Sequence, residues 1–312
     1  MTMPAPAAAS VRNGNDVPEP LFAGVELGGT KTIAVIGQGG KILDRVTIPT
    51  TRPAETLAAT AEQLRSWYRE HRPAALGVAS FGPIALNARH GEYGHMLSTP
   101  KEGWSGAAIV GPLVEVMPVP VALHTDVTAA ALAEGRWGAA RGVSDFVYVT
   151  IGTGIGMGVV AGGRPVTGRM HPEAGHLRVR RMAGDGFAGN CPFHGDCLEG
   201  LAAGPAIAAR TGTSANKLSP EDPAWIPVAD ALAEGMVSLF LTLSCERVIV
   251  GGGVGVGQPH LLALVRDRIG EKLAGYLPDM DEATLRAMIV HAEMGADAGP
   301  LGTLELAALA RG

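Results

Sequence analysis

The chain has 312 residues, carries a formal net charge of −5, and is 46% apolar but only 4% aromatic. This length suits two domains, and a core of Ala, Val, Leu and Ile favours an α/β protein. The lack of a basic run argues against a nucleic-acid partner, and the lack of 18 successive apolar residues argues against a membrane span. Three cysteines, two of them in a metal-like array, fit a reducing compartment, so we expect a cytoplasmic protein.

The chain opens with an Ala- and Pro-rich stretch, residues 1–20, which lacks the charged start of a signal peptide and is interpreted as a flexible tail. Residues 22–36 are two apolar runs around a Gly-Gly-Thr-Lys turn, which predicts a hairpin. Residues 146–161 repeat this design around Gly-Thr-Gly-x-Gly. The internal repeat predicts a duplicated α/β unit with a cleft between its copies.

Other elements follow from periodicity and end signals. In the first half, helices are predicted over 53–71 and near 106–117, and strands over 75–80 and 119–123. Thr125-Asp126-Val127-Thr128 then signals the start of another helix. In the second half, we expect helices over 198–209, 223–243 and 299–311 and one that ends near Leu273, with strands over 247–250 and 286–291.

Residues 171–200 contain the strongest metal-binding pattern. Cys191, His194 and Cys197 form a CxxHxxC array, and His176 lies upstream across a glycine-rich loop, so four donors can converge on one tetrahedral ion. A disulfide or two inert thiols is the alternative for the cysteines. The histidine between them and the loose loop around them favour a structural zinc site.

Three glycine-rich segments are candidates for nucleotide binding. Glycines leave amide groups unshielded, and Thr30 and Thr153 add hydroxyls at matching places of the two hairpins. A plain tight turn is the alternative for either hairpin alone, and the Walker pattern is absent. Residues 251–257 resemble a dinucleotide-binding turn, but their late position and lack of an acidic partner favour a floor under adenine or ribose. The candidates are Gly28, Gly29, Thr30, Lys31, Gly152, Thr153, Gly154, Gly156, Gly251, Gly252 and Gly253.

Three carboxylates are candidates for chemistry and substrate binding. Asp126 lies at a strand-to-helix junction, where it can act as a general base or serve only as an N-cap. Glu173 and Glu199 flank the metal-binding pattern. Each is either a solvated surface group or a partner of sugar hydroxyls, because a carboxylate can accept several hydrogen bonds.

Taken together, these segments resemble the ROK family of sugar kinases and repressors, and within it the zinc-containing fructokinases. The resemblance runs from about Leu21 to the C-terminus and rests on the motifs ELGGTK (26–31), FGPI (81–84), YGHMLSTPKEGW (93–104), TDV (125–127), IGTGIG (151–156), HPEAGH (171–176), CPFHGDCLEG (191–200) and GGGV (251–254). It implies an actin-like, duplicated ribonuclease-H-like fold. The first domain would span 21–124 together with the closing helix 298–312, and the second 125–297 with a zinc loop over 171–200.

The resemblance also implies transfer of the γ-phosphoryl group of ATP to a hexose, with Mg²⁺ on the nucleotide and a homodimeric assembly. Asp126 matches the family's base. The zinc ligands match His176, Cys191, His194 and Cys197. The sugar-binding positions match Gly82, Pro83, Thr125, Asp126, Glu173, His176 and Glu199.

Two residues depart from common family patterns. Glu26 stands where many members carry Asp, which leaves open how Mg²⁺ is placed. Thr125 stands where glucose-type members carry Asn, which favours fructose over mannose or glucose. We therefore expect conversion of fructose to fructose 6-phosphate, with a broader hexokinase as the alternative.

The sequence fits two other functions less well. ROK repressors place a DNA-binding domain before the first hairpin, and the two dozen residues found there leave no room for one. A non-catalytic sugar sensor is therefore the less expected alternative. A zinc hydrolase needs an open coordination position, which four protein ligands would close.

Overall fold

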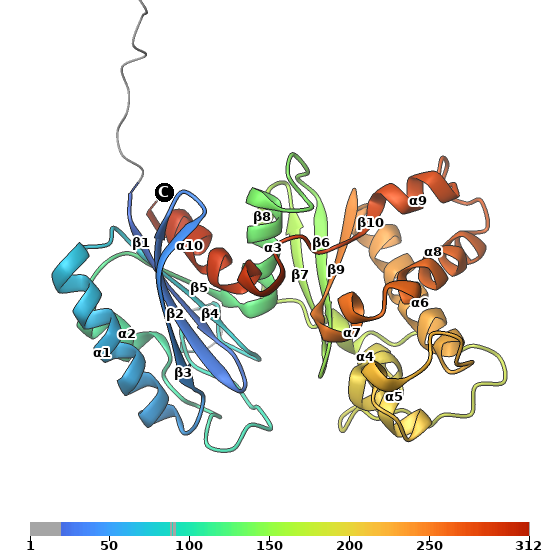
Figure 1. Cartoon of the computed structure of the whole chain (residues 1–312), viewed down its shortest axis with the longest axis horizontal. Coiled ribbons are helices and arrows are strands. Elements are labelled where there is room, and N and C mark those ends of the chain that lie inside the picture. Colours follow the sequence, from blue (N-terminus) through green and yellow to red (C-terminus); the bar gives the residue numbers. More distant parts are fainter. Residues whose placement is uncertain (1–19, 88, 90–91, 312) are drawn as a thin grey trace, which may run out of the picture.

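Two five-stranded mixed sheets organise the protein, one in each half of the chain (Figure 1). The computed structural model describes residues 20–87, 89 and 92–311, so the predicted tail lies outside the described residues except for Pro20. The first sheet has the order β3-β2-β1-β4-β5 and the second β10-β9-β6-β7-β8. The strands are β1 (Phe22–Leu27), β2 (Lys31–Gln38), β3 (Lys41–Pro49), β4 (Leu76–Ser80), β5 (Val121–Thr125), β6 (Phe146–Ile151), β7 (Ile155–Ala161), β8 (Arg164–Pro165), β9 (Arg247–Gly251) and β10 (Ile289–His291).

The two sheets share one pairing pattern. In the first, β1 is antiparallel to β2 and parallel to β4, and in the second β6 is antiparallel to β7 and parallel to β9. Both Gly-rich turns therefore occupy the same place, between the central strand of a sheet and its antiparallel neighbour. The predicted duplicated α/β fold is confirmed.

Ten α-helices surround the sheets within the described residues. They are α1 (Pro53–His71), α2 (Val110–Val116), α3 (Asp126–Trp137), α4 (Leu198–Ala202), α5 (Gly204–Thr211), α6 (Trp225–Leu243), α7 (Gly252–Gly257), α8 (Pro259–Leu273), α9 (Glu282–Met288) and α10 (Ala298–Arg311). Short 3₁₀ turns lie at Ala174–His176, Ala215–Lys217 and Gly295–Asp297.

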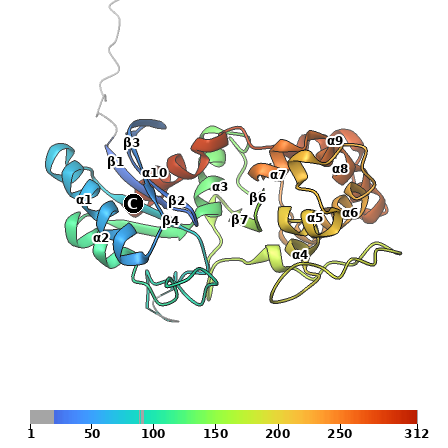
Figure 2. The same ribbon diagram turned by 60° about the horizontal axis from the view of Figure 1, so that its bottom comes forward.

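Helices α3 and α10 lie between the sheets and pack on each other (Figures 1 and 2). Helix α3 follows β5 of the first sheet but packs on β6 and β7 of the second. Helix α10 follows the second sheet but packs on β1, β4 and β5 of the first. Each half of the chain therefore supplies a helix to the other half, and the start of α3 lies where the two lobes meet.

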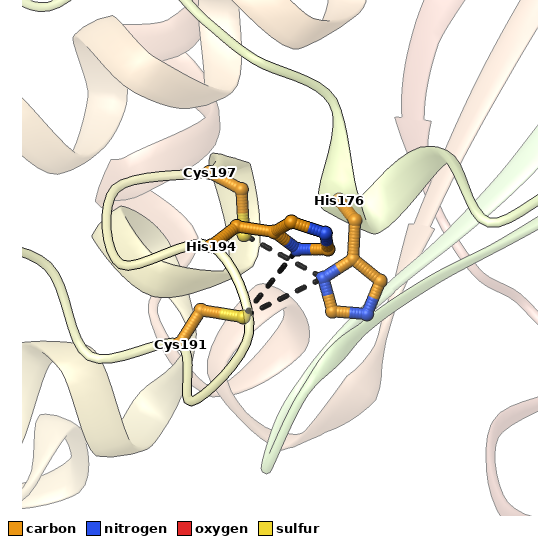
Figure 3. A group of neighbouring side chains, drawn as sticks. All are labelled: His176, Cys191, His194 and Cys197. Carbon is orange, nitrogen blue, oxygen red and sulfur yellow. Dashed lines mark hydrogen bonds between the residues drawn. The ribbon is translucent and has the colours of Figure 1, made fainter. Parts of the chain in front are cut away.

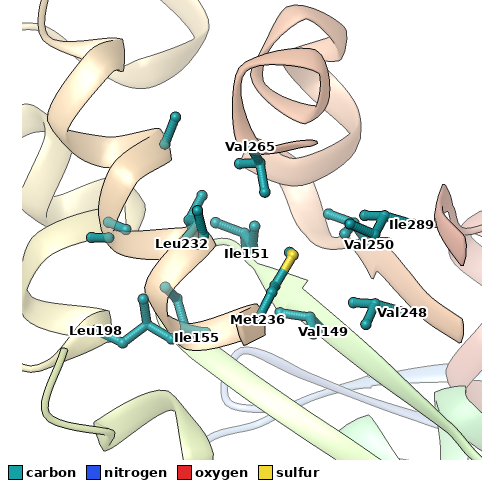
Figure 4. Close-up of a cluster of buried hydrophobic side chains, with 14 of the residues drawn as sticks. Val149, Ile151, Ile155, Leu198, Leu232, Met236, Val248, Val250, Val265 and Ile289 are labelled. Carbon is teal, nitrogen blue, oxygen red and sulfur yellow. The ribbon is translucent and has the colours of Figure 1, made fainter. Parts of the chain in front are cut away.

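The largest hydrophobic core lies in the second lobe, between its sheet and helices α4, α6 and α8 (Figure 4). Val149, Val248 and Val250 of the sheet face Leu232 and Met236 of α6 there. Burial of each such side chain contributes roughly 1.5–3 kcal/mol. Helix α6 is long and apolar enough to cross a membrane by composition alone, but 61% of that window is buried inside the protein, so it is a core helix.

Three sequence predictions need correction, and one strand was not predicted. The helix predicted over 198–209 is two helices, because Ala203 is extended and α5 begins at Gly204 with Pro205 in its first turn. The strand predicted over 286–291 is only β10, because residues 286–288 end helix α9, which Asp281 caps. The strand expected over 119–123 is shifted to β5, and β3 was not predicted.

Candidate active site and metal centre

A pocket of about 500 Å³ opens between the two lobes and holds all seven residues matched to the sugar site. The first lobe contributes the loop after β4, and the second contributes β7 and residues 171–200, here called the metal loop. The seven residues are Gly82, Pro83, Thr125, Asp126, Glu173, His176 and Glu199. Four separate segments of the chain thus converge on one hollow.

Asp126 is the first residue of α3, and Thr125 is the N-cap. The Thr125 hydroxyl oxygen accepts a hydrogen bond from the Thr128 N–H at 3.3 Å, so the interpretation of Asp126 as an N-cap is wrong. Burial raises the pKa of Asp126 to about 6, and the nearby Glu173 carboxylate also raises it, although the Val127 N–H lowers it. Above this pH the carboxylate is charged and able to accept a proton.

Glu26, at the end of β1, is a second perturbed carboxyl near Asp126. Burial raises the pKa of Glu26 to about 7, and repulsion by Asp126 adds to the shift, while Lys31 and Arg45 oppose it. Its side chain lies against Gly299 at the start of α10, where a Cβ atom would be 2.1 Å from the Glu26 Oε1 atom. The Glu26 side chain therefore occupies space that Gly299 leaves open.

The four metal-donor residues are brought together (Figure 3). One ligand atom from each of His176, Cys191, His194 and Cys197 lies within 4.8 Å of all the others. The Nδ1 atom of His176 is 3.7 Å from the Cys191 sulfur and 3.5 Å from the Cys197 sulfur, and His194 Nδ1 is 3.7 Å from Cys191. Tetrahedral zinc, with bonds of about 2.0–2.3 Å, separates its ligand atoms by about 3.3–3.8 Å. The donor set therefore fits zinc.

All three cysteines are free thiols in this structure, so the disulfide alternative is wrong. The Nε2 atom of His176 lies on the side of its ring away from the two sulfur atoms (Figure 3). Because His176 also lines the pocket, one ring nitrogen can bind the metal while the other faces the pocket.

Ion pairs hold the rest of the metal loop. The Arg210 guanidinium of α5 contacts both Asp185 carboxylate oxygens, at 2.6 and 3.0 Å, and both side chains are nearly buried. Arg181 donates to the Asp185 carbonyl oxygen and pairs with Asp196. Bidentate pairs of this kind fix geometry as well as adding energy. The glycine-rich part of the loop is therefore anchored to the second lobe by side chains as well as by the donor cluster.

The turn of the second hairpin lies beside Gly251–Gly253, whereas the turn of the first hairpin lies apart from the pocket lining. A Cβ atom at Gly152 would be 3.8 Å from Gly253 N. Gly152 O also accepts a hydrogen bond from Gly204 N, at the start of α5, at 2.8 Å. Gly28 to Lys31 do not line the pocket between the lobes. The Lys101 amine donates to Gly29 O at 2.6 Å, so the STPKEGW segment reaches the first turn.

Sequence reasoning missed Lys101 and His171 as candidate site residues. Lys101 lies in the YGHMLSTPKEGW motif and His171 in the HPEAGH motif, but only the folded chain shows what they touch: Lys101 contacts a residue 72 positions away, and His171 one 87 positions away. A charged or imidazole side chain in a glycine- and proline-rich loop was the available signal.

Comparison with known proteins agrees with this architecture. The ROK family model matches residues 22–310. Fructokinase from Pediococcus pentosaceus is 38% identical over 290 residues, which cover 92% of this chain and 97% of that protein. Fructokinase from Zymomonas mobilis is 38% identical over 293 residues, with coverages of 92% and 96%. The solved ROK hexokinase from Thermus thermophilus is 30% identical, with a TM-score of 0.77 and coverages of 93% and 98%.

Duplicated mixed sheets, matching Gly-rich hairpins and an interlobe pocket define a two-lobed protein of the actin-like ATPase fold. The chain belongs to the ROK family, as its motifs predicted.

Proposed function

We propose that the protein is an ATP-dependent sugar kinase that phosphorylates D-fructose to fructose 6-phosphate. The observation that carries this proposal is the convergence of Asp126 with Glu173, His176 and Glu199 around one pocket. Full-length similarity to proteins named fructokinase supports the choice of sugar. The similar ROK hexokinase of Thermus thermophilus favours a broader hexose kinase as the second candidate.

In the proposed reaction, a sugar hydroxyl oxygen attacks the γ-phosphorus of ATP. The bond between the γ-phosphorus and the oxygen that bridges to the β-phosphate breaks, and ADP leaves. Asp126 accepts the proton of the attacking hydroxyl. Its pKa of about 6 leaves the carboxylate mostly charged at neutral pH yet basic enough to take a proton. Glu173 and Glu199 hold other sugar hydroxyls as acceptors, and the Nε2–H of a metal-bound His176 would donate to a hydroxyl oxygen.

The Gly-rich turns are proposed to bind ATP. Backbone amides of Gly28 to Lys31 and of Gly152 to Gly156 would offset phosphate charge, and residues 251–253 would underlie the nucleoside. Mg²⁺ bound with ATP would neutralise charge on the phosphates, and Glu26 and Asp126 are the carboxylates near this region. Sugar binding would close the lobes and exclude water from the phosphate.

The four-residue donor set is proposed to hold Zn²⁺ in a structural role. Two thiolates and two imidazoles fill a tetrahedral shell, so the site would be closed rather than catalytic. The metal loop carries Glu173, His176 and Glu199, so ordering it would order the sugar site. We further propose a first domain of residues 21–124 with 298–312 and a second of residues 125–297. We also propose a homodimeric assembly, a cytoplasmic location, and no nucleic-acid or membrane partner.

The experiment is a coupled ADP-release assay across fructose, mannose and glucose, with metal content measured on the same sample. We expect the highest kcat/KM for fructose and about one zinc per chain. Comparable values for all three hexoses would favour the hexokinase alternative. No turnover with any hexose would reject the proposed substrate class, and sugar binding without turnover would favour a sensor.

A further inference from the structure

His171 is a buried residue of the pocket wall with no role in the proposed chemistry. It begins the HPEAGH motif in the second lobe, and only 4% of its surface is exposed. It also lines the pocket beside Glu173. Burial of an imidazole requires partners for its nitrogen atoms.

The contacts of the ring fix which nitrogen carries the proton. The backbone N–H of Ile84 donates to His171 Nε2 at 3.1 Å, so Nε2 acts as an acceptor and carries no proton. In a neutral imidazole the proton then lies on Nδ1. Nδ1 has a hydrogen bond with Pro172 O at 3.4 Å and lies at ion-pair distance, 3.3 Å, from Glu173 Oε1. The nitrogen that must donate therefore lies between the Pro172 carbonyl and the Glu173 carboxylate.

These contacts cross from one lobe to the other. Ile84 belongs to the FGPI segment after β4, whereas His171 and Glu173 belong to the metal loop. Gly82 of the same segment lies close to both: a Cβ atom there would be 3.2 Å from His171 Cε1 and 3.5 Å from Glu173 Oε1. The absence of a side chain at Gly82 leaves the imidazole and the carboxylate room against the backbone.

Glu173 needs such a partner. Its side chain is 45% exposed, and its charge interacts unfavourably with that of Asp126. In the described part of the chain, His171 is the one ion-pair partner of the Glu173 side chain. An exposed glutamate without a donor would sample several rotamers, and ordering it on sugar binding would cost entropy.

We propose that His171 is a positioning residue: the Ile84 N–H fixes its Nδ1–H tautomer, and this N–H holds the Glu173 carboxylate toward the sugar pocket. The inference rests on the proposed role of Glu173 in sugar binding. His171 itself does not touch the reacting atoms. Within the HPEAGH motif, Glu173 then contacts the sugar, and His171, two residues earlier, supplies the donor that orients Glu173.

Two substitutions test the roles of the two ring nitrogens of His171 separately. The Asn side-chain nitrogen lies as many bonds from Cβ as Nδ1 does, so H171N keeps a donor toward Glu173 and loses the Ile84 acceptor. The Gln side-chain oxygen lies as far out as Nε2, so H171Q keeps the Ile84 acceptor and loses the donor. Both variants remove the ring, so lost packing affects them alike. The exposed His71→Asn variant is the control for a histidine outside the pocket.

The readouts are fructose KM, ATP KM, kcat and thermal unfolding. We expect H171Q to raise fructose KM about tenfold, or about 1.4 kcal/mol, with ATP KM and kcat changed less than threefold. H171N should keep fructose KM within about threefold of wild type but lower Tm, because a buried N–H loses its acceptor. In E173A, adding H171Q should not raise KM further.

Equal KM increases in H171N and H171Q, or an unchanged KM in H171Q, would overturn the inference. Nitrogen-15 NMR of histidine-labelled protein tests the tautomer without activity: the His171 signal, assigned by its loss in H171N, must show protonated Nδ1, and protonated Nε2 would also overturn it. Failure of wild type to phosphorylate any hexose would instead refute the proposed function.

Discussion

Glu199 Oε2 accepts a hydrogen bond from the Ile155 backbone N–H at 3.0 Å, and this bond joins the metal loop to the second Gly-rich hairpin. Glu199 lies two residues after the metal-donor Cys197, and Ile155 begins β7 directly after the hairpin turn. The proposed sugar and nucleotide sites are therefore in direct contact through one carboxylate. A substitution in either of these two sites should therefore alter binding at the other site.

Gly154 tests this contact, because a Cβ atom there would be 2.6 Å from Glu199 Oε2. The carboxylate is the far end of a flexible side chain, so in G154A it should move rather than the fold break. We expect the loss of one hydrogen bond, about 1 kcal/mol of stability, and an increase in fructose KM. Steady-state kinetics and urea unfolding measure both. The control is G168A, since a Cβ at Gly168 would meet nothing within 4 Å; equal kinetics in the two variants would contradict the account.

The base role of Asp126 predicts a specific pH dependence. Its pKa of about 6 means that kcat/KM for the sugar should fall roughly tenfold per pH unit below pH 6, as the carboxyl gains a proton, and level off above it. The substitution D126N should lower kcat by about 10²–10⁴-fold with an unchanged circular dichroism spectrum. Near-normal turnover in D126N would remove Asp126 from the mechanism.

Glu26 predicts a pH dependence of stability. Its folded pKa of about 7 exceeds the ordinary glutamate pKa of 4.5 that applies in the unfolded chain, so the folded state favours the protonated form. The stability that this carboxyl contributes is full below pH 4.5 and is lost as pH rises through 7. E26Q stays neutral, so its stability relative to wild type should increase from pH 5 to pH 8. Urea unfolding at both pH values measures this, and a constant difference would show that Glu26 is not perturbed.

The fold could be predicted because its main signals are local. Two apolar runs around each Gly-rich turn fix a hairpin, and the repeat of that unit predicts duplication. Strand β3 was missed, although Gly39 and Gly40 between alternating runs form a hairpin turn with positive φ at both residues. Its side chains are mostly exposed, so its apolar signal was weak.

The site was only partly predictable. The CxxHxxC spacing placed three donors within seven residues, so their convergence needed no knowledge of the fold. The Glu199–Ile155 and His171–Ile84 contacts join residues 44 and 87 positions apart and depend on how the lobes meet. Backbone N–H donors are present at every residue except proline, so no sequence pattern marks the ones that a side chain will use.

The most direct test of the central claim, that the metal loop orders the sugar site, is the fructose Kd by calorimetry before and after metal removal. The protein is stripped with a chelator, its zinc content is measured, and its folded state is checked by circular dichroism. We predict that the metal-free protein stays folded and binds fructose about tenfold more weakly, and that added zinc restores the Kd. An unchanged Kd in folded, metal-free protein would contradict the account.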